Sequence, residues 1–365
     1  MGGPLRVGVI GVGVISAQYF GSFPRLDNLR LTAVADLNLE RAREVAAEQG
    51  VTAMSVDELL ASPEVDVVLN LTIPAAHVEI GTRALQAGKH VFAEKPLGLT
   101  VAEARPMLEL AHARGLRVGS APDTVLGTGI QTARQLLDDG TVGAPLSAAA
   151  SWSSPGHERW HPAPAFYYQP GGGPLLDMGP YYITALVTLL GPVTRVTGVG
   201  RRSSRARSIG SGPNAGTALP IDVDTTVTAI LEHAAGPFST VTVSFDRWAT
   251  RSPLFELYGE SGTIAVPDPN RFEDPVEVFT AETAEWRTAP PSAGYAEAAR
   301  GYGLADLARA VETDRPHRAS GELALHVLDV MESVLRSNEE HAVLELSTTV
   351  DRPEAVPAGV TPSTW

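Results

Sequence analysis

The chain has 365 residues, 44% apolar residues, a formal net charge of −14 and no cysteine. This length allows two folded domains, and the composition is that of a globular rather than a disordered protein. The acidic balance argues against nucleic acid as a partner, and the lack of cysteine excludes disulfides, thiolate catalysis and cysteine-built zinc sites.

The first third of the chain alternates short apolar runs with helix-like segments. The runs lie at 6–12, 29–36, 65–72, 90–94 and 116–121. Continuous apolar strands separated by amphipathic helices predict parallel strands buried on both faces, hence a doubly wound Rossmann sheet. The apolar N-terminus has spaced glycines and no cleavage site, and no run is long enough to span a membrane. We therefore expect a soluble, cytoplasmic protein with no membrane partner.

The pattern changes after about residue 125. A helix is predicted at 129–140, alternating strands at 224–234 and 238–248, two further strands within 255–267, and helices at 302–312 and 322–338. Alternating strands joined by tight turns are typical of an antiparallel sheet. The predicted fold class is α/β, with a Rossmann domain at 1–124. An α+β domain with a large, mainly antiparallel sheet follows at 125–365, for substrate binding and oligomerisation.

A glycine pattern follows the first predicted strand. Gly11, Gly13 and Ser16 form G-x-G-x-x-S, with a helix predicted after it. Gly11 permits a tight turn, Gly13 allows pyrophosphate to approach the backbone, and Ser16 is another small residue. Asp36 ends the second strand, 20 residues beyond Ser16. The context predicts dinucleotide binding rather than a glycine turn beside a surface aspartate.

Asp36 also indicates which dinucleotide binds. A carboxylate accepts hydrogen bonds from the adenosine ribose and repels a 2′-phosphate. No arginine or lysine follows Asp36 directly, and Arg41, the nearest base, is expected to be a solvated charge on the next helix. NAD is therefore favoured over NADP.

The stretch "KHVFAEKPLG" (89–98) ends a strand on Glu94 and Lys95 and then stops at Pro96. Ligands of open parallel sheets bind beyond the carboxyl ends of the strands, where these two charges fall. Together with "GVIGVGVIS", "AVADLNLERA" and "GGGPLLDMGPYYITALVTLLGP", this stretch resembles the Gfo/Idh/MocA oxidoreductases. These NAD(P)-dependent enzymes act in many cases on sugars and cyclitols.

The resemblance implies roles for these residues. Lys95 would hydrogen-bond the reacting hydroxyl or carbonyl, Glu94 would contact the nicotinamide ribose, and Pro96 would fix the lysine backbone, often through a cis peptide. An isolated Glu-Lys-Pro is more often a surface pair, but the preceding "AGKHV" disfavours that interpretation. The candidate cofactor contacts are Gly11, Gly13, Val14, Ile15, Asp36, Thr72, Pro74, His77, Glu94 and Lys95.

The family's second motif, D-x-G-x-H-x-x-D, is altered here. It reads "DMGPYYIT", with Asp177, then Tyr181 in place of histidine and Thr184 in place of the second aspartate. Some sugar-active members also carry tyrosine there. Asp177 and Tyr181 are four residues apart and share one face of a helix. A phenol exchanges the substrate proton when an ammonium such as Lys95 stabilises the phenolate. The alternative is a core tyrosine beside an N-capping aspartate.

A segment dense in aromatic and histidine residues precedes this motif. We call residues 154–173 the aromatic loop, and its candidate substrate contacts are His157, Trp160, His161 and Tyr168. Sugars bind to aromatic faces and directed polar groups, although a loop that packs on itself would have the same composition. A metal site from His157, Glu158 and His161 is rejected, because a proline-broken loop holds ligands poorly.

The remaining candidate contact is Asp123, which follows the fifth run in "SAPDTVLG", where many members carry Asn and Arg. The catalytic candidates are Lys95, Tyr181 and Asp177. The predicted activity is NAD-dependent oxidation of a secondary hydroxyl of a sugar, glycoside or cyclitol by a homo-oligomer, a dimer or tetramer. Two alternatives stay open: redox-neutral glycoside cleavage with tightly bound NAD, and a non-catalytic nucleotide sensor.

Overall fold

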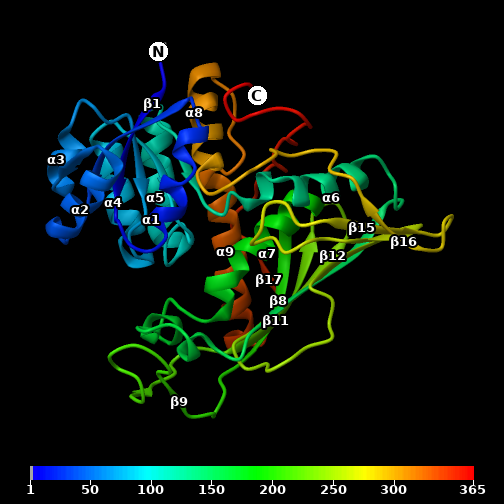
Figure 1. The fold of residues 1–365 in the computed structure, drawn as a ribbon. Helices are drawn as coiled ribbons and strands as arrows, with labels where there is room; N and C mark the ends of the chain where they lie inside the picture. Colours follow the sequence, from blue (N-terminus) through cyan, green and yellow to red (C-terminus); the bar gives the residue numbers. More distant parts are fainter. Residues whose placement is uncertain (1–2) are drawn as a thin grey trace.

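The computed structural model describes residues 3–365 and contains two large sheets (Figure 1). The first sheet is wholly parallel, with strand order β3-β2-β1-β4-β5-β6. Its strands are β1 (Leu5–Ile10), β2 (Leu29–Ala35), β3 (Thr52–Met54), β4 (Val67–Asn70), β5 (His90–Ala93) and β6 (Val118–Ser120). The strand order reverses between β1 and β4, which is where ligands of doubly wound sheets bind.

Helices flank this sheet, as the alternating pattern predicted. They are α1 (Ser16–Phe20), α2 (Leu39–Gln49), α3 (Val56–Ala61), α4 (His77–Gln86) and α5 (Val101–Ala113), with short 3₁₀ turns η1 (Phe23–Arg25), η2 (Pro74–Ala76) and η3 (Thr124–Leu126). Their ends carry ordinary caps: Ser55 and Glu58 form a capping box before α3, and Gly50 ends α2 at φ 68°. All four residues of β4 are buried, as expected for a strand covered on both faces.

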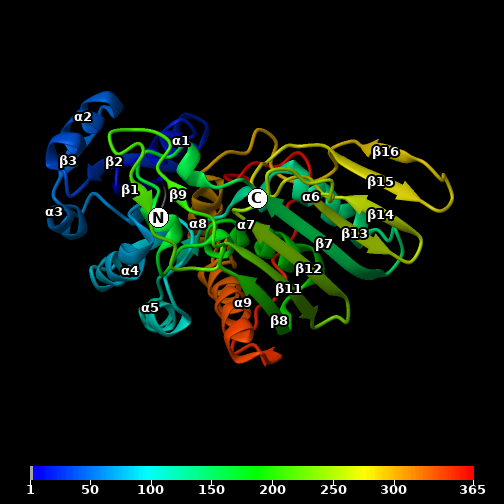
Figure 2. The same cartoon turned by 90° about the horizontal axis from the view of Figure 1, so that it is seen from below.

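The second sheet has nine strands in the order β16-β15-β14-β13-β7-β12-β11-β8-β17 (Figure 2). Only the β7–β12 pair is parallel, so the prediction of a mainly antiparallel sheet is confirmed. The strands are β7 (Pro145–Ser153), β8 (Val193–Arg201), β11 (Thr226–His233), β12 (Phe238–Ser244), β13 (Phe255–Gly259), β14 (Gly262–Ala265), β15 (Val276–Thr280), β16 (Trp286–Ala289) and β17 (Leu344–Glu345). A separate hairpin pairs β9 (Arg207–Ser208) with β10 (Ala218–Leu219).

One face of the second sheet is covered by helices α6 (Thr128–Asp138), α7 (Pro174–Leu190) and α9 (Gly321–Glu340). In β11 the residues Val227, Ala229 and Leu231 are buried on the helix side, while Thr228 and Ile230 are exposed on the other face. The alternation therefore predicts one buried and one open face, and the structure has both.

The C-terminal helices join the two sheets. Helix α8 (Tyr302–Thr313) and helix α9 pack against β6, and Ser320 forms a bridge with Gly119. The chain therefore returns to the Rossmann sheet after building the second sheet, and the boundary at residue 124 stays a prediction. No helix within residues 3–365 is both long enough and apolar enough to cross a membrane.

Acidification is expected to destabilise this fold through buried histidines. Burial lowers the pKa of both His90 and His326 from 6.5 to about 4. The unfolded chain therefore binds more protons than the folded chain below pH 6.5, and stability is lost as pH falls toward 4. We expect a loss of about 2 kcal/mol per histidine between pH 7 and pH 5, measured by urea unfolding. A free energy of unfolding that stays constant across this window would contradict the prediction.

Candidate active site

The glycine turn after β1 is shaped to receive a ligand backbone. Gly11 has φ 94°, and a Cβ there would lie 2.7 Å from the Leu71 carbonyl, so only glycine fits. At Gly13 a Cβ would meet nothing within 4 Å. The protein itself therefore does not require Gly13, and the open space beside it fits a dinucleotide pyrophosphate that approaches the backbone. Ser16 is buried and donates a hydrogen bond to the Gly13 carbonyl at 2.7 Å.

Asp36 lies beside this turn at the end of β2. Its Oδ2 accepts a hydrogen bond from Val12 N at 2.9 Å, and its Oδ1 accepts one from Asn38 N at 2.8 Å. Both bonds come from backbone amides, so they orient the carboxylate without neutralising its charge. Arg41 is exposed and pairs with Glu44 at 3.2 Å on helix α2, as expected for a solvated helix charge.

Three large apolar side chains are exposed where β1, β2 and β4 end. Val14 is 97% exposed, Leu37 99% and Ile73 69%. Isolated exposed apolar residues are common, but these three stand at the edge where the strand order reverses. Flat apolar faces of a dinucleotide would cover them. The open turn, the oriented carboxylate and these side chains fit NAD.

Exchanging the cofactor preference tests this arrangement. In Asp36→Ser/Leu37→Arg the repelling carboxylate is gone and a guanidinium replaces the leucine. We expect the ratio of NADP to NAD affinity to rise by on the order of 100-fold, measured by quenching of tryptophan fluorescence. Leu37→Arg alone is the matched control and should still disfavour NADP, because Asp36 remains. An unchanged affinity ratio in the double variant would mean that the adenosine ribose does not lie beside Asp36.

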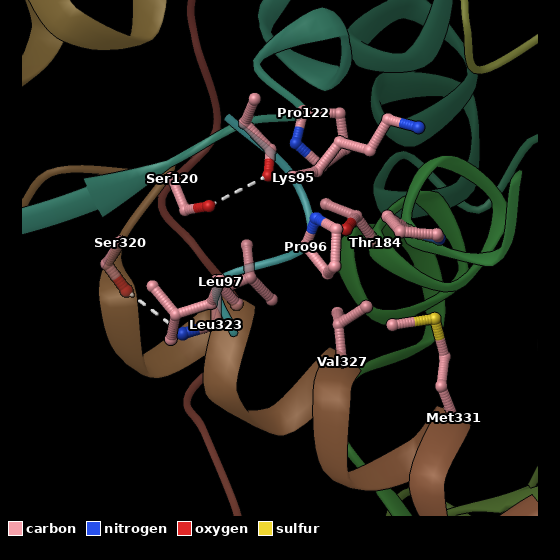
Figure 3. A pocket seen from close by; sticks show the side chains of 13 residues that line it. Lys95, Pro96, Leu97, Ser120, Pro122, Thr184, Ser320, Leu323, Val327 and Met331 are labelled. Atoms are coloured by element: carbon pink, nitrogen blue, oxygen red, sulfur yellow. Dashed lines mark hydrogen bonds between the residues drawn. The ribbon is translucent and has the colours of Figure 1, made fainter. Parts of the chain in front are cut away.

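The turn after β5 brings Lys95 to the same edge. The Lys95–Pro96 peptide is cis. Figure 3 shows Pro96 and Leu97 packed against helix α9, while the Lys95 side chain points away from Leu323 and Val327. The cavity between these elements has a volume of about 10 Å³. Such a cavity is at the lower limit for one water molecule, so the turn is closely packed against its neighbours. Glu94 accepts hydrogen bonds from Tyr19 Oη at 2.8 Å and from Lys95 N at 3.0 Å.

Lys95, Asp177 and His157 form one connected chain. Lys95 Nζ donates to the Asp177 carbonyl oxygen at 2.7 Å and to Asp177 Oδ1 at 3.0 Å, while His157 Nε2 lies 2.9 Å from Asp177 Oδ2. Burial alone would raise the pKa of Asp177, but Lys95 and His157 outweigh it and lower the pKa to about 2. Burial lowers the pKa of Lys95, and the charge of Asp177 more than offsets this, so the amine is held as ammonium. The side chain of Asp177 does not cap helix α7, which excludes the N-cap alternative.

Tyr181 lies one turn further along helix α7, on the same face as Asp177. Arg300 Nη2 donates a hydrogen bond to Tyr181 Oη at 3.0 Å, and Lys95 Nζ lies 5.1 Å from the centre of the phenol ring. Arg300 comes from the segment before α8 and is 7% exposed. Sequence reasoning missed Arg300, because "EAARGYG" contains nothing that ties it to a residue 119 positions earlier. The cation that contacts the phenol oxygen is therefore Arg300, and Lys95 faces the ring.

The aromatic loop contributes a different tyrosine from the one predicted. Tyr168 is fully buried and its hydroxyl donates to Glu158, so the prediction that Tyr168 contacts substrate is wrong. Its neighbour Tyr167 is only half-buried and lies with its ring centre 4.5 Å from that of His157. Burial and the charge of Asp177 raise the pKa of Tyr167 to about 12, which keeps the phenol neutral.

The rest of the aromatic loop presents an uneven apolar surface beside Tyr167. Trp160 is 59% exposed and Phe166 50% exposed, and His161 packs edge-on against both of their rings. The 3₁₀ helix η5 (Ala165–Tyr168) carries Phe166 and Tyr167, while Trp160 and His161 follow η4 (His157–Arg159).

A buried ion-pair network holds the base of the aromatic loop. Arg207 has a fully buried side chain and donates to Glu158 Oε1 at 2.7 Å and to Asp246 Oδ1 at 2.6 Å. The basic stretch "RRSSRAR" (201–207) therefore ends on a buried arginine. Glu158 is committed to Arg207 and His157 to Asp177, so neither points toward a common metal position.

Two further candidate residues form hydrogen bonds with the protein backbone around the site. Asp123 is fully buried, and its Oδ2 accepts hydrogen bonds from the amides of Gly301 and Gly303, at 2.9 and 3.0 Å. His77 is 1% exposed, and its ring nitrogens lie 2.7 Å from the Pro96 carbonyl and 3.0 Å from the Thr72 carbonyl. Asp123 Oδ2 and both ring nitrogens of His77 are thus engaged within the protein, so the structure does not favour the predicted side-chain contacts of Asp123 with substrate and of His77 with cofactor. Pro74 begins η2, which is followed directly by His77.

Comparison with known proteins agrees with this geometry. Residues 5–121 match the family model described as "Oxidoreductase family, NAD-binding Rossmann fold", and residues 130–265 match the GFO/IDH/MocA C-terminal domain. The chain is thus an oxidoreductase with an NAD-binding domain. It belongs to the Gfo/Idh/MocA family.

Named relatives show the range of this family. A dTDP-3,4-didehydro-2,6-dideoxy-alpha-D-glucose 3-reductase from Streptomyces violaceoruber is 35% identical over 63% of this chain and 68% of its own length. A trans-1,2-dihydrobenzene-1,2-diol dehydrogenase from Bos taurus is 29% identical over 73% of this chain and 75% of its own. The structure of an NAD binding oxidoreductase from Klebsiella pneumoniae superimposes with a TM-score of 0.82 at 21% identity. It covers 94% of this chain and 99% of that one, which shows the shared fold.

Proposed function

We propose that this enzyme interconverts a secondary hydroxyl of a sugar, glycoside or cyclitol and the corresponding ketone, with NAD as cofactor. The observation that carries the proposal is the hydrogen bonding of Lys95. An ammonium has three donors, and two of the three are taken by Asp177. The remaining donor is available to a single oxygen, such as that of the reacting hydroxyl or carbonyl.

Tyr181 supports the proton transfer that this reaction requires. Bound NAD supplies the hydride acceptor, so the protein must take up the hydroxyl proton. Lys95 is held as ammonium and is therefore a donor rather than a base. Arg300 and Lys95 place two positive charges around the phenol of Tyr181, which stabilises its phenolate as proton acceptor. In the opposite direction the phenol returns the proton to the carbonyl oxygen.

The aromatic loop supports a sugar-like substrate. Tyr167 and Phe166 stack with ring centres 4.0 Å apart, and Trp160 is exposed beside His161. Apolar faces of pyranose and cyclitol rings pack on such surfaces, while a small hydroxy acid would leave them uncovered. The similarity to a dTDP-sugar reductase makes a nucleotide-linked keto sugar a second candidate substrate, used in the reductive direction.

A substrate screen tests the proposal. Purified protein is incubated with NAD and a panel of hexoses, glycosides and inositols, and with NADH and keto sugars, free or nucleotide-linked. We expect absorbance of NADH to change with one of these classes and to stay constant with small hydroxy acids. Activity confined to small acids would overturn the substrate class. Glycoside cleavage found by mass spectrometry without net NADH would instead identify the redox-neutral reaction.

The open face of the second sheet supports a homo-oligomer. Val199 and Ile230 are 67% and 46% exposed on neighbouring strands β8 and β11, with threonines around them. A second copy of the sheet would cover these residues, whereas a monomer would leave them in water. A dimer or tetramer by light scattering is expected, and a monomer at micromolar concentration would contradict it. The cytoplasmic location stays a prediction.

A further inference from the structure

The imidazole of His157 contacts Asp177 rather than Lys95 or Tyr181, and it is held tightly in that place. Its ring lies within 4.5–5.8 Å, centre to centre, of four other aromatic rings: Trp152, Trp160, Tyr167 and Phe245. The residue is 8% exposed. Rings from strand β7, from the aromatic loop and from the end of β12 thus fix the plane of the imidazole.

The contact with Asp177 fixes the imidazole tautomer. Asp177 is a carboxylate and only accepts hydrogen bonds, so the proton must lie on His157 Nε2, 2.9 Å from Oδ2. Nδ1 is buried and has no hydrogen-bond partner among residues 3–365. An unpartnered buried polar atom costs about 1–3 kcal/mol, so His157 is not at this place for stability alone.

The carboxylate of Asp177 is consequently divided between two donors. Oδ2 is engaged by His157 and Oδ1 by Lys95 at 3.0 Å. If Oδ2 were free, the carboxylate could rotate and take more than one of the lysine protons. Holding Oδ2 therefore keeps the third Lys95 donor directed away from Asp177.

We propose that His157 is a positioning residue that acts through Asp177 to hold Lys95 with one donor free for the substrate oxygen. The imidazole reaches Asp177 from a 3₁₀ turn 20 residues upstream, not from helix α7. This inference rests on the proposed function for its kinetic consequence. Its structural consequence, the position of the Lys95 amine, is independent of substrate.

The sequence offers an unusually clear spectroscopic test. The chain has two lysines, Lys89 and Lys95, among its 28 basic residues. Protein labelled with 13C at the lysine ε-carbon therefore gives two signals, and Lys89→Met assigns them. Lys95 Nζ lies 5.1 Å from the Tyr181 ring centre, so the ring current makes its ε-carbon signal sensitive to position.

Three variants test whether the N–H donor of His157 positions the Lys95 amine. In His157→Leu, we expect the Lys95 signal to move or broaden while the Lys89 signal stays. We also expect kcat to fall on the order of 100-fold with little change in KM. A misplaced donor stabilises the transition state less well but leaves the binding of the substrate largely unchanged. In His157→Gln, whose amide supplies an N–H near the Nε2 position, both properties should be largely restored. His112→Gln, at an exposed pair with Glu322, should change neither.

The outcomes that overturn the proposal are equally specific. A Lys95 signal that is identical in wild type and His157→Leu would show that His157 does not position the amine. Equal loss of kcat in the Leu and Gln variants would also contradict it, since the N–H donor would then be irrelevant. If His157→Leu does not fold, His157→Asn replaces it, because its amide stands at the Nδ1 position. A wild-type protein that turns over no sugar would refute the proposed function, while the signal still tests His157.

Discussion

Lys95→Met is expected to cause a large loss of turnover while NAD still binds. The substitution removes the one donor aimed at the reacting oxygen and keeps the length of the side chain. Loss of a preorganised donor costs about 10²–10³-fold in kcat, and a charged donor lies at the upper end. Affinity for NAD, followed by tryptophan fluorescence, should change little, because the glycine turn and Asp36 are untouched.

The same substitution should also destabilise the protein, and a second variant separates the two effects. Lys95→Met leaves Asp177 as a buried carboxylate without its main partner, which costs about 3–5 kcal/mol. Lys95→Met/Asp177→Asn removes that charge, so stability should recover while kcat does not. Lys89→Met is the matched lysine control, since Lys89 Nζ donates to the carbonyls of Ser62 and Val65. Restored turnover in the double variant would show that Lys95 acts through stability alone.

The first sheet and its ligand-binding edge could be predicted from the sequence because the information is local. Buried parallel strands are continuous apolar runs, and a turn that needs φ 94° requires glycine at position 11. Asp36 and Lys95 end strands, so their place at the ligand edge follows from the topology. A sequence pattern does not show which polar side chains form buried hydrogen bonds within the protein, so it predicts ligand contacts for His77 and Asp123 that their bonding in the structure does not favour.

The second half of the candidate site was predictable only in part. Asp177 and Tyr181 share a helix face because they are four residues apart, and this required no tertiary information. Arg300 and Arg207 could not be found, since their partners lie 119 and 49 residues away in the sequence. In the aromatic loop, composition identified a cluster of rings but not its orientation. The adjacent tyrosines differ in burial: Tyr168 is fully buried, with the Arg207 guanidinium 5.0 Å from its ring centre, and Tyr167 is half-buried.

Tyr181→Phe is expected to lower kcat about 10²–10⁴-fold, the usual contribution of a positioned acid–base group. The ring is retained, so its packing beside Arg300 and Lys95 is kept and the protein should remain folded. The KM for the sugar should change less than kcat, because the loss falls on proton transfer rather than on binding.

Arg300 provides the sharper part of this test. Its Nη2 donates to Tyr181 Oη at 3.0 Å, so Arg300→Met removes the cation that contacts the phenol oxygen. We expect kcat for sugar oxidation to fall in Arg300→Met, and to fall further in Tyr181→Phe. Because Arg300 acts on the reaction through Tyr181, the double variant should be no slower than Tyr181→Phe alone. Additive losses would instead mean that Arg300 contacts the substrate directly, and an unchanged kcat in Arg300→Met would show that Arg300 does not assist Tyr181.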